Sequence, residues 1–265
     1  MKKAFLLLVV LALAIGLIGY FRVARQPQVP VTYPIPEAPD TPGILYPIEG
    51  AAPKSEPATP VIDPEKPLPE LRESDERIED TLSRLFAGRE IDKFFVLDNF
   101  IRRFVVMVDN LPRRNLPATH MPTKPVPGNF LVVGKDQNLE IDPANYRRYA
   151  PYIQLAEAVE PARLVAVYVR FYPLFQEAYR ELGYPSGYFN DRLVEVIDHL
   201  LAVPEVSHPI RLAQPKIAYQ YANPELESLS AGRKILIRMG PENAARVKSI
   251  LRRYRRELTA ASDRN

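Results

Sequence analysis

The chain has 265 residues, with 35 Lys and Arg against 32 Asp and Glu, which gives a formal net charge of +3. It contains no Cys, which excludes disulfides, thiolate metal sites, iron–sulfur clusters and cysteine nucleophiles. The three His and the small net charge disfavour a multi-histidine metal centre and a protein that coats nucleic acid. We therefore expect no cofactor and no nucleic-acid partner. Pro, in contrast, occurs 28 times against 11 Gly.

The N-terminus carries an uncharged apolar run of 18 residues, from Ala4 to Phe21. A helix of that length crosses the roughly 30 Å hydrocarbon layer of a bilayer. A cleaved signal peptide is the alternative, because Ala12-Leu13-Ala14 offers a cleavage site, but cleavage there would leave an apolar remnant. We expect residues 1–25 to be an uncleaved single-pass anchor. A small charge bias across the run places the rest of the chain outside the cytoplasm.

Thirteen prolines punctuate residues 26–69. Each proline removes a backbone donor and disfavours helical backbone in the residue before it. We predict that residues 26–71 form a disordered, extended linker. At about 3.1 Å per residue, such a linker reaches at most on the order of 140 Å and holds a domain away from the membrane. A ligand for a proline-binding module is the alternative, but the prolines follow no defined repeat.

Residues 72–258 are predicted to be a single multi-helix globular domain, mainly α, with a minor β-hairpin at 130–141. Ser74, Asn190 and Ser230 are predicted helix N-caps. Residues 111–128 and 209–222 are expected to be extended, and 259–265 to be a flexible tail. Apolar spacings of three and four, capping residues and prolines predict helices over residues 75–87, 90–110, 161–182, 191–202, 230–239 and 241–258, with shorter ones between 142 and 159.

Three long segments, residues 140–149, 172–201 and 237–248, carry a family resemblance. Over most of residues 70–258 the chain resembles the bacterial domain of unknown function 3014 family. The resemblance implies an envelope protein with a membrane anchor, a proline-rich tether and one such domain, and it implies no catalytic residues. With the anchor, it predicts a location in the bacterial inner membrane with the C-terminal domain in the periplasm.

One face of the helix predicted at 191–202 is polar. It brings together Asp191, Glu195, Asp198 and His199, whereas the opposite arc is apolar. Carboxylates and an imidazole at these spacings could share a divalent ion or act as an acid and a base. The alternative, which we favour, is a solvated polar face, because no second cluster of ligands occurs elsewhere in the sequence.

Aromatic and basic residues give two candidate binding surfaces. Tyr184 and Tyr188 flank a Pro-Ser-Gly loop, and aromatic side chains beside prolines can bind extended peptides or sugar rings. Arg252, Arg253 and Arg256 lie on the last predicted helix and could contact an anionic partner, although basic residues also suit the C-terminal end of a helix. His120 and His208 lie in proline-flanked loops and are expected at the surface.

Two functions are compatible with these patterns. The first is a non-enzymatic, membrane-tethered interaction module, with the bilayer contacted through residues 4–21 and an envelope protein or an anionic surface as partner. The second is a metal-assisted or hydrolytic envelope enzyme that uses the polar face of residues 191–202. The first is favoured, because no nucleophile-elbow, phosphate-loop or dinucleotide-binding motif occurs in the sequence.

Overall fold

The structure, a computed structural model, describes residues 43–48, 67–87, 89–136, 138–215 and 217–263. The predicted anchor at residues 4–21 and most of the predicted linker lie outside these ranges. None of the helices within the described ranges combines the length and the apolar character needed to cross a bilayer.

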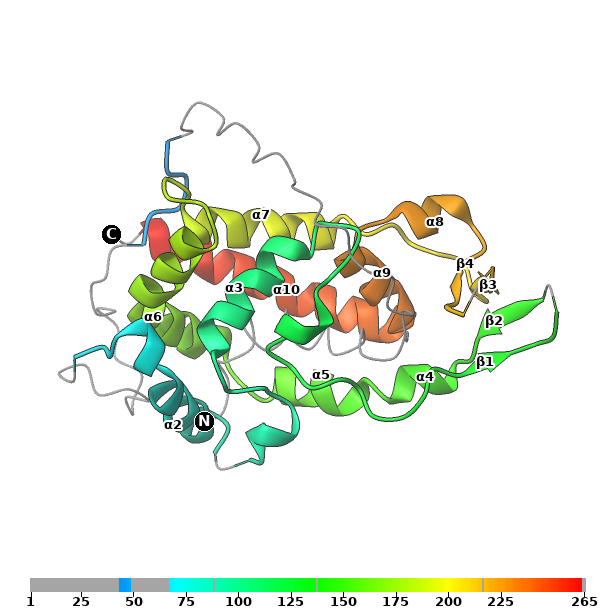
Figure 1. Cartoon of the computed structure of the whole chain (residues 1–265), viewed down its shortest axis with the longest axis horizontal. Coiled ribbons are helices and arrows are strands. Elements are labelled where there is room, and N and C mark those ends of the chain that lie inside the picture. Colours follow the sequence, from blue (N-terminus) through cyan, green and yellow to red (C-terminus); the bar gives the residue numbers. More distant parts are fainter. Residues whose placement is uncertain (1–42, 49–66, 88, 137, 216, 264–265) are drawn as a thin grey trace.

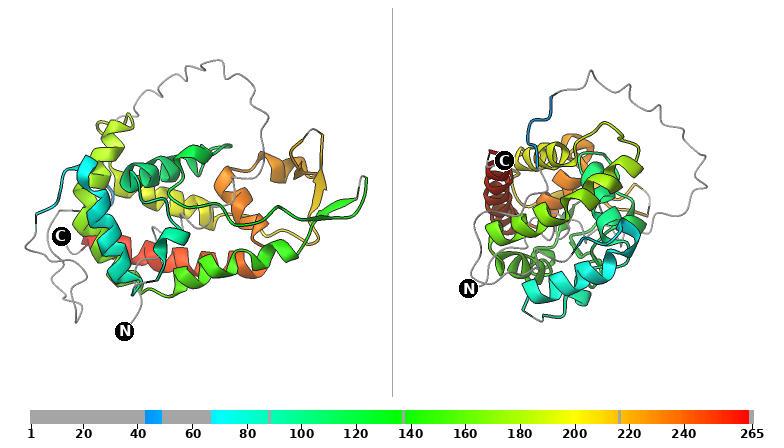
Figure 2. Two further views of the ribbon diagram at one scale, coloured as in Figure 1. Left: turned by 60° about the horizontal axis from the view of Figure 1, so that its bottom comes forward. Right: turned by 90° about the vertical axis from the view of Figure 1, so that its left-hand side faces the viewer.

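Four long helices form the body of the domain (Figure 1). They are α3 (Phe100–Asn110), α6 (Pro161–Glu181), α7 (Phe189–Leu201) and α10 (Pro241–Asp263). Helix α3 packs against α6 and α7, and α10 runs along the body in contact with α5, α6, α7 and α9 (Figure 2). At the centre, the ring of Phe104 lies 5.5 Å from that of Phe175 and 6.3 Å from that of Phe189. Buried aromatic rings therefore join three of the four helices.

Other elements surround this body. Within the described ranges, the other helices are α2 (Asp75–Leu85), α4 (Ala144–Arg147), α5 (Ala150–Glu157), α8 (Pro224–Ser228) and α9 (Ala231–Arg238), and there are 3-10 turns at Leu71–Glu73, Ile91–Lys93 and Ala118–His120. The α9 helix begins at the predicted cap, where the Ser230 hydroxyl accepts a hydrogen bond from the N–H of Arg233.

A small antiparallel sheet lies at one end of the molecule, to the right in Figure 1. Its strands are β1 (Val132–Val133), β2 (Leu139–Ile141), β3 (Arg211–Ala213) and β4 (Gln220–Tyr221), in the order β1-β2-β3-β4. The predicted hairpin is thus present and forms half of a larger sheet, because Leu139 pairs with Leu212 and Leu212 with Tyr221. The sequence predicts at most a two-stranded hairpin and so underestimates the size of this four-stranded sheet.

The predicted helix bounds 90–110 and 241–258 differ from the structure. Residues 90–110 do not form one helix, because the backbone near Phe95 turns away to pair with Thr123, and α3 begins only at Phe100. At the other end of the chain, α10 continues past Leu258 to Asp263. Ala261 lies buried there, so the five residues after Leu258 belong to the helix and not to a flexible tail.

Candidate functional site

Six residues of the predicted linker, 43–48, lie against the start of α7, and we call them the strap (Figure 1, blue). They form no regular secondary structure, but Ile48 is only 5% exposed and belongs to the hydrophobic core. The expectation that residues 26–71 stand apart from the domain is therefore wrong for these six, and also for residues 67–71, where Leu71 is buried in the core. Polar side chains of the domain bind their backbone, which composition alone does not reveal.

The start of α7 is held in place by Gln176 of α6, which is buried. Its carbonyl oxygen accepts hydrogen bonds from the N–H of Phe189 (2.9 Å) and from the hydroxyl of Tyr172 (2.8 Å). Its amide nitrogen donates to the carbonyl of Gly187 (2.7 Å). One glutamine side chain thus fixes both the loop before α7 and the first free N–H of the helix.

Three side chains at the start of α7, those of Tyr188, Asn190 and Asp191, bind the strap and form what we call the strap site. The Asp191 carboxylate accepts hydrogen bonds from the N–H of Leu45 (3.0 Å) and of Tyr46 (2.8 Å). The Asn190 amide donates to the carbonyl of Tyr46 (3.0 Å). These bonds involve only main-chain atoms of the strap.

The Tyr188 hydroxyl completes the strap site at Ile48. It donates to the carbonyl of Ile48 (3.0 Å) and accepts from its N–H. The Tyr188 ring lies 5.4 Å from that of Tyr172, which in turn lies 5.6 Å from that of Tyr168. A ladder of three aromatic rings therefore leads from the strap into the core.

Asn190 is not the N-cap that the sequence predicts. The helix begins at Phe189, two residues before the predicted start, with Tyr188 in the capping position. Asn190 is fully buried and uses its amide for the strap. The cap prediction failed because Asn has the same donor and acceptor whether it serves its own helix or another segment.

The four residues of the predicted polar face have separate partners. Asp191 binds the strap, and Glu195 pairs with Arg192 (2.8 Å). Asp198 forms a two-bond ion pair with Arg255 of α10 (2.5 and 2.9 Å). His199 hydrogen-bonds through Nε2 to the hydroxyl of Ser230 (2.7 Å). Among the described residues, no group of three or more His, Asp and Glu side chains could hold a metal ion.

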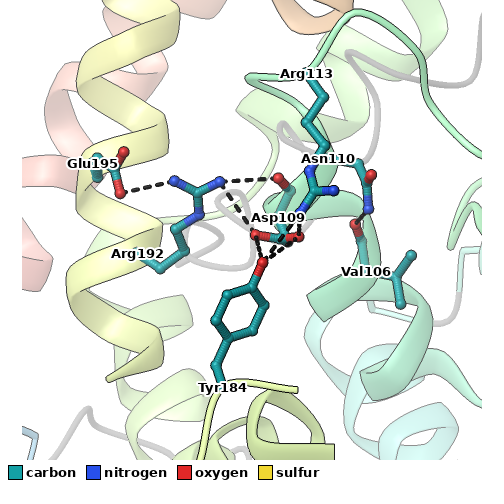
Figure 3. A network of polar contacts seen from close by, with 7 residues as sticks. All are labelled: Val106, Asp109, Asn110, Arg113, Tyr184, Arg192 and Glu195. Carbon is teal, nitrogen blue, oxygen red and sulfur yellow. Dashed lines mark hydrogen bonds and ion pairs between the residues drawn. The ribbon is translucent and has the colours of Figure 1, made fainter. Parts of the chain in front are cut away.

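A second polar cluster lies between α7 and α3 and surrounds Asp109, which is 2% exposed (Figure 3). The Asp109 carboxylate accepts from Arg113 (2.6 Å) and lies 3.2 Å from the guanidinium of Arg192. The Tyr184 hydroxyl donates to the same carboxylate at 3.2 Å. Burial and the charge of Asp109 raise the pKa of Tyr184, so its hydroxyl stays protonated and acts as a donor.

Tyr184 was predicted to be exposed and available for binding, but the structure ties it to this buried cluster. Its ring stacks on that of Tyr179, with the ring centroids 4.6 Å apart. Tyr188, predicted with it, contacts an extended segment of the chain itself. Sequence patterns did not identify Asp109, Arg113 and Arg192 as a cluster, because α3 and α7 are far apart along the chain.

The predicted basic surface on α10 is partly engaged within the domain. Arg246 pairs with Glu157 of α5 at 2.6 Å, and Arg255 pairs with Asp198. Arg252 and Arg256 are exposed and Arg253 is half-buried. Of the two loop His, His120 is exposed, and His208 contacts the hydroxyl of Tyr146 at 3.3 Å.

Comparison with known proteins gives one match. No curated protein and no solved structure matches the chain. The model of one family, described as "Protein of unknown function (DUF3014)", matches residues 100–255. The matched span is more than half of the chain and contains the strap site and the Asp109 cluster, but not the strap. The chain belongs to the DUF3014 family.

Proposed function

We propose that this protein is an interaction module, tethered to the bacterial inner membrane through residues 4–21, whose helical domain faces the periplasm and binds extended peptide segments. One observation carries the interaction part of this proposal. The domain holds a proline-containing segment of extended chain through Tyr188, Asn190 and Asp191, in a manner that satisfies the backbone of the bound segment. Backbone binding of this kind is how many domains recognise peptides.

The position of the strap in the chain supports a role in setting the distance to the membrane. Between Phe21 and Gly43 there are 21 residues. At about 3.1 Å per residue they span at most roughly 65 Å, whereas the chain from the anchor to Pro67 spans up to about 140 Å. A bound strap therefore halves the distance over which the domain can move from the bilayer.

The anchor also supports the membrane part of the proposal. Its 18 uncharged residues match the thickness of a bilayer, and two Lys precede it while Arg22 and Arg25 follow it. The positive charge of the free N-terminus adds one more on the leading side. That difference favours retention of the N-terminus in the cytoplasm.

A reporter enzyme that is active only outside the cytoplasm, fused after Asn265, tests the topology. We expect reporter activity, with the fusion retained in membranes after a carbonate wash. Deleting residues 4–21 should abolish both, and this chain is the matched control. Activity only from a reporter that works in the cytoplasm would overturn the membrane part of the proposal.

A further inference from the structure

The hydrogen bonds of Tyr188, Asn190 and Asp191 to the strap all go to its main chain. Asp191 binds two consecutive N–H groups, Asn190 one carbonyl, and Tyr188 a further N–H and carbonyl pair. Every extended peptide offers such groups wherever it lacks proline at the donor positions. The site can therefore bind segments other than the strap.

The side chains of the strap contribute unevenly to its binding. Ile48 is buried and Tyr46 packs against the core, but Ile44 is 56% exposed and Leu45 69% exposed. Two large apolar side chains thus gain little from the bound position. The contacts define a minimal ligand: an extended segment with an aromatic residue and, two residues later, a buried apolar residue.

The strap also leaves polar atoms of the site unsatisfied. Asn190 is fully buried, yet no described residue donates a hydrogen bond to its Oδ1. Tyr168, at the inner end of the aromatic ladder, is 1% exposed, and its hydroxyl likewise has no partner within the described ranges. Buried polar atoms without partners weaken a complex. A ligand that donates to Asn190 Oδ1 would bind better than the strap does.

Such a ligand could come from a second copy of this chain or from a different protein, and the short connection between the strap and its own domain distinguishes the two. A second copy of this chain presents the same strap with the same contacts. It competes with a strap that is connected to its own domain by only 18 residues, 49–66, and so is present at an effective concentration in the millimolar range. An identical segment in solution cannot win that competition at ordinary concentrations, but a segment of a different protein with a better fit can.

We propose that the strap is an internal competitor, and that the strap site is the receptor for an extended segment of a partner protein that carries an aromatic residue and, two residues later, an apolar one. This proposal rests on the interaction part of the proposed function and does not depend on the membrane anchor. Binding of the partner displaces residues 43–48 from α7. The displacement frees the chain between residue 43 and residue 66 and so allows the domain to move farther from the bilayer.

The test uses the full chain in detergent micelles and a fluorescent peptide with the sequence of residues 43–48. Ile48→Asp places a charge at a buried position of the strap and should release it, leaving the strap site intact. We expect this variant to bind the peptide at least about tenfold more tightly than the wild type does, because a strap that is bound about 90% of the time lowers the apparent affinity by that factor.

A second release variant and a matched pair of substitutions make the result specific. Leu45→Pro with Tyr46→Pro removes both N–H groups that Asp191 binds and should act like Ile48→Asp. In the released chain, Asp191→Ala should reduce peptide binding at least tenfold. Glu195→Gln, one turn along α7 and paired with Arg192, should leave it unchanged.

Three outcomes would overturn the proposal. The first is equal peptide affinity in the wild type and in both release variants, with folding confirmed by circular dichroism. The second is binding that survives Asp191→Ala. The third is concentration-dependent dimerisation of the wild type that Ile48→Asp abolishes, which would make a second copy the occupant. None of these outcomes affects membrane retention, so a failure here is distinguishable from a failure of the anchor.

Discussion

Two aspartates, one within α7 and one in the neighbouring helix α3, show two different uses of a carboxylate. Asp109 is buried between α7 and α3 and is bound by Arg113, Arg192 and Tyr184. Asp191, at the start of α7, is bound by two main-chain N–H groups of the strap. Asp109 is held by side chains that belong to the folded domain, whereas Asp191 is held by a segment that lies more than 140 residues away in sequence.

The difference shows which contact is structural and which one can exchange. A buried carboxylate between two guanidinium groups has no alternative partner, so its loss leaves charges uncompensated. A half-buried carboxylate that binds N–H groups can exchange them for those of another peptide or for water. The same residue type therefore stabilises the domain at one position and recognises a chain at the other.

The largest effect is expected from Asp109→Ala. The substitution leaves Arg192 without its buried counter-charge and the Tyr184 hydroxyl without its acceptor, so we expect a loss of about 3 kcal/mol or more in the free energy of unfolding. Urea denaturation measures it. The matched control is Asp98→Ala, which removes an exposed ion pair with Arg103 near the other end of α3 and should cost less than about 1 kcal/mol. Similar losses in the free energy of unfolding for Asp109→Ala and Asp98→Ala would contradict a structural role for Asp109.

A smaller effect is expected from Asp191→Ala, which removes the acceptor of two strap N–H groups. We expect a loss of about 1–2 kcal/mol, because hydrogen bonds to a charged group contribute that much when partly exposed. The more direct measurement is limited proteolysis, in which chymotrypsin should cleave after Leu45, an exposed residue of the strap, faster than in the wild type. Glu195→Ala is the control. Unchanged cleavage after Asp191→Ala would show that Asp191 does not hold the strap.

A chain that lacks the strap also tests whether Asp191 stabilises the protein only through its contact with the strap. The proline-rich composition of residues 26–69 predicts that a chain beginning at Glu70 melts like one beginning at Gln26. The bound strap changes that expectation, since the loss of Ile48 exposes apolar surface of the core. The shorter chain should melt at a lower temperature, and Asp191→Ala should destabilise it no further, because the two changes remove the same interaction. Additive losses of stability from the truncation and from Asp191→Ala would show that Asp191 has a stabilising contact other than the strap.

The smallest effect concerns His199, at the other end of α7. Burial and the positive charge of Arg233 hold the pKa of His199 below its ordinary value of 6.5. The unfolded chain then binds the proton more tightly, so this contribution to stability is present above pH 6.5 and is lost as the pH falls through the folded pKa. Compared with the wild type, His199→Gln should therefore lose less stability between pH 7.5 and pH 5. His120→Gln, in an exposed turn, is the matched control.

The sequence predicted those parts of the fold that depend on local signals. The bounds of α6 and the capping of α9 by Ser230 follow from a proline, a periodic apolar pattern and a hydroxyl, all of which act within a few residues. The break between Ile91–Lys93 and α3 was missed, because it depends on pairing of Phe95 with Thr123, and the apolar spacing continues through it. Tertiary pairing overrode the local pattern there.

The candidate site was predicted in its residue types but not in its partners. Tyr188 and Asp191 were both singled out, for an aromatic loop and a polar helix face, yet their common ligand lies in a segment whose composition predicts only a spacer. One signal was present in that segment. This stretch is otherwise polar and rich in proline, but it contains an apolar cluster of Ile44, Leu45, Tyr46 and Ile48. Such a cluster is more typical of a segment that binds a protein surface than of a solvated spacer.

The start of α9 has a consequence for how the domain can be divided. The N–H groups of Ala231 and Gly232 donate to the carbonyls of Arg113 (2.7 Å) and Leu111 (3.0 Å), just after α3 ends. A Cβ on Gly232 would lie 2.6 Å from a Leu200 methyl and 3.1 Å from the Leu111 carbonyl, so only glycine permits this approach. Two fragments separated between these regions, such as 67–215 and 217–263, should each be incompletely folded alone and should reassemble when they are mixed.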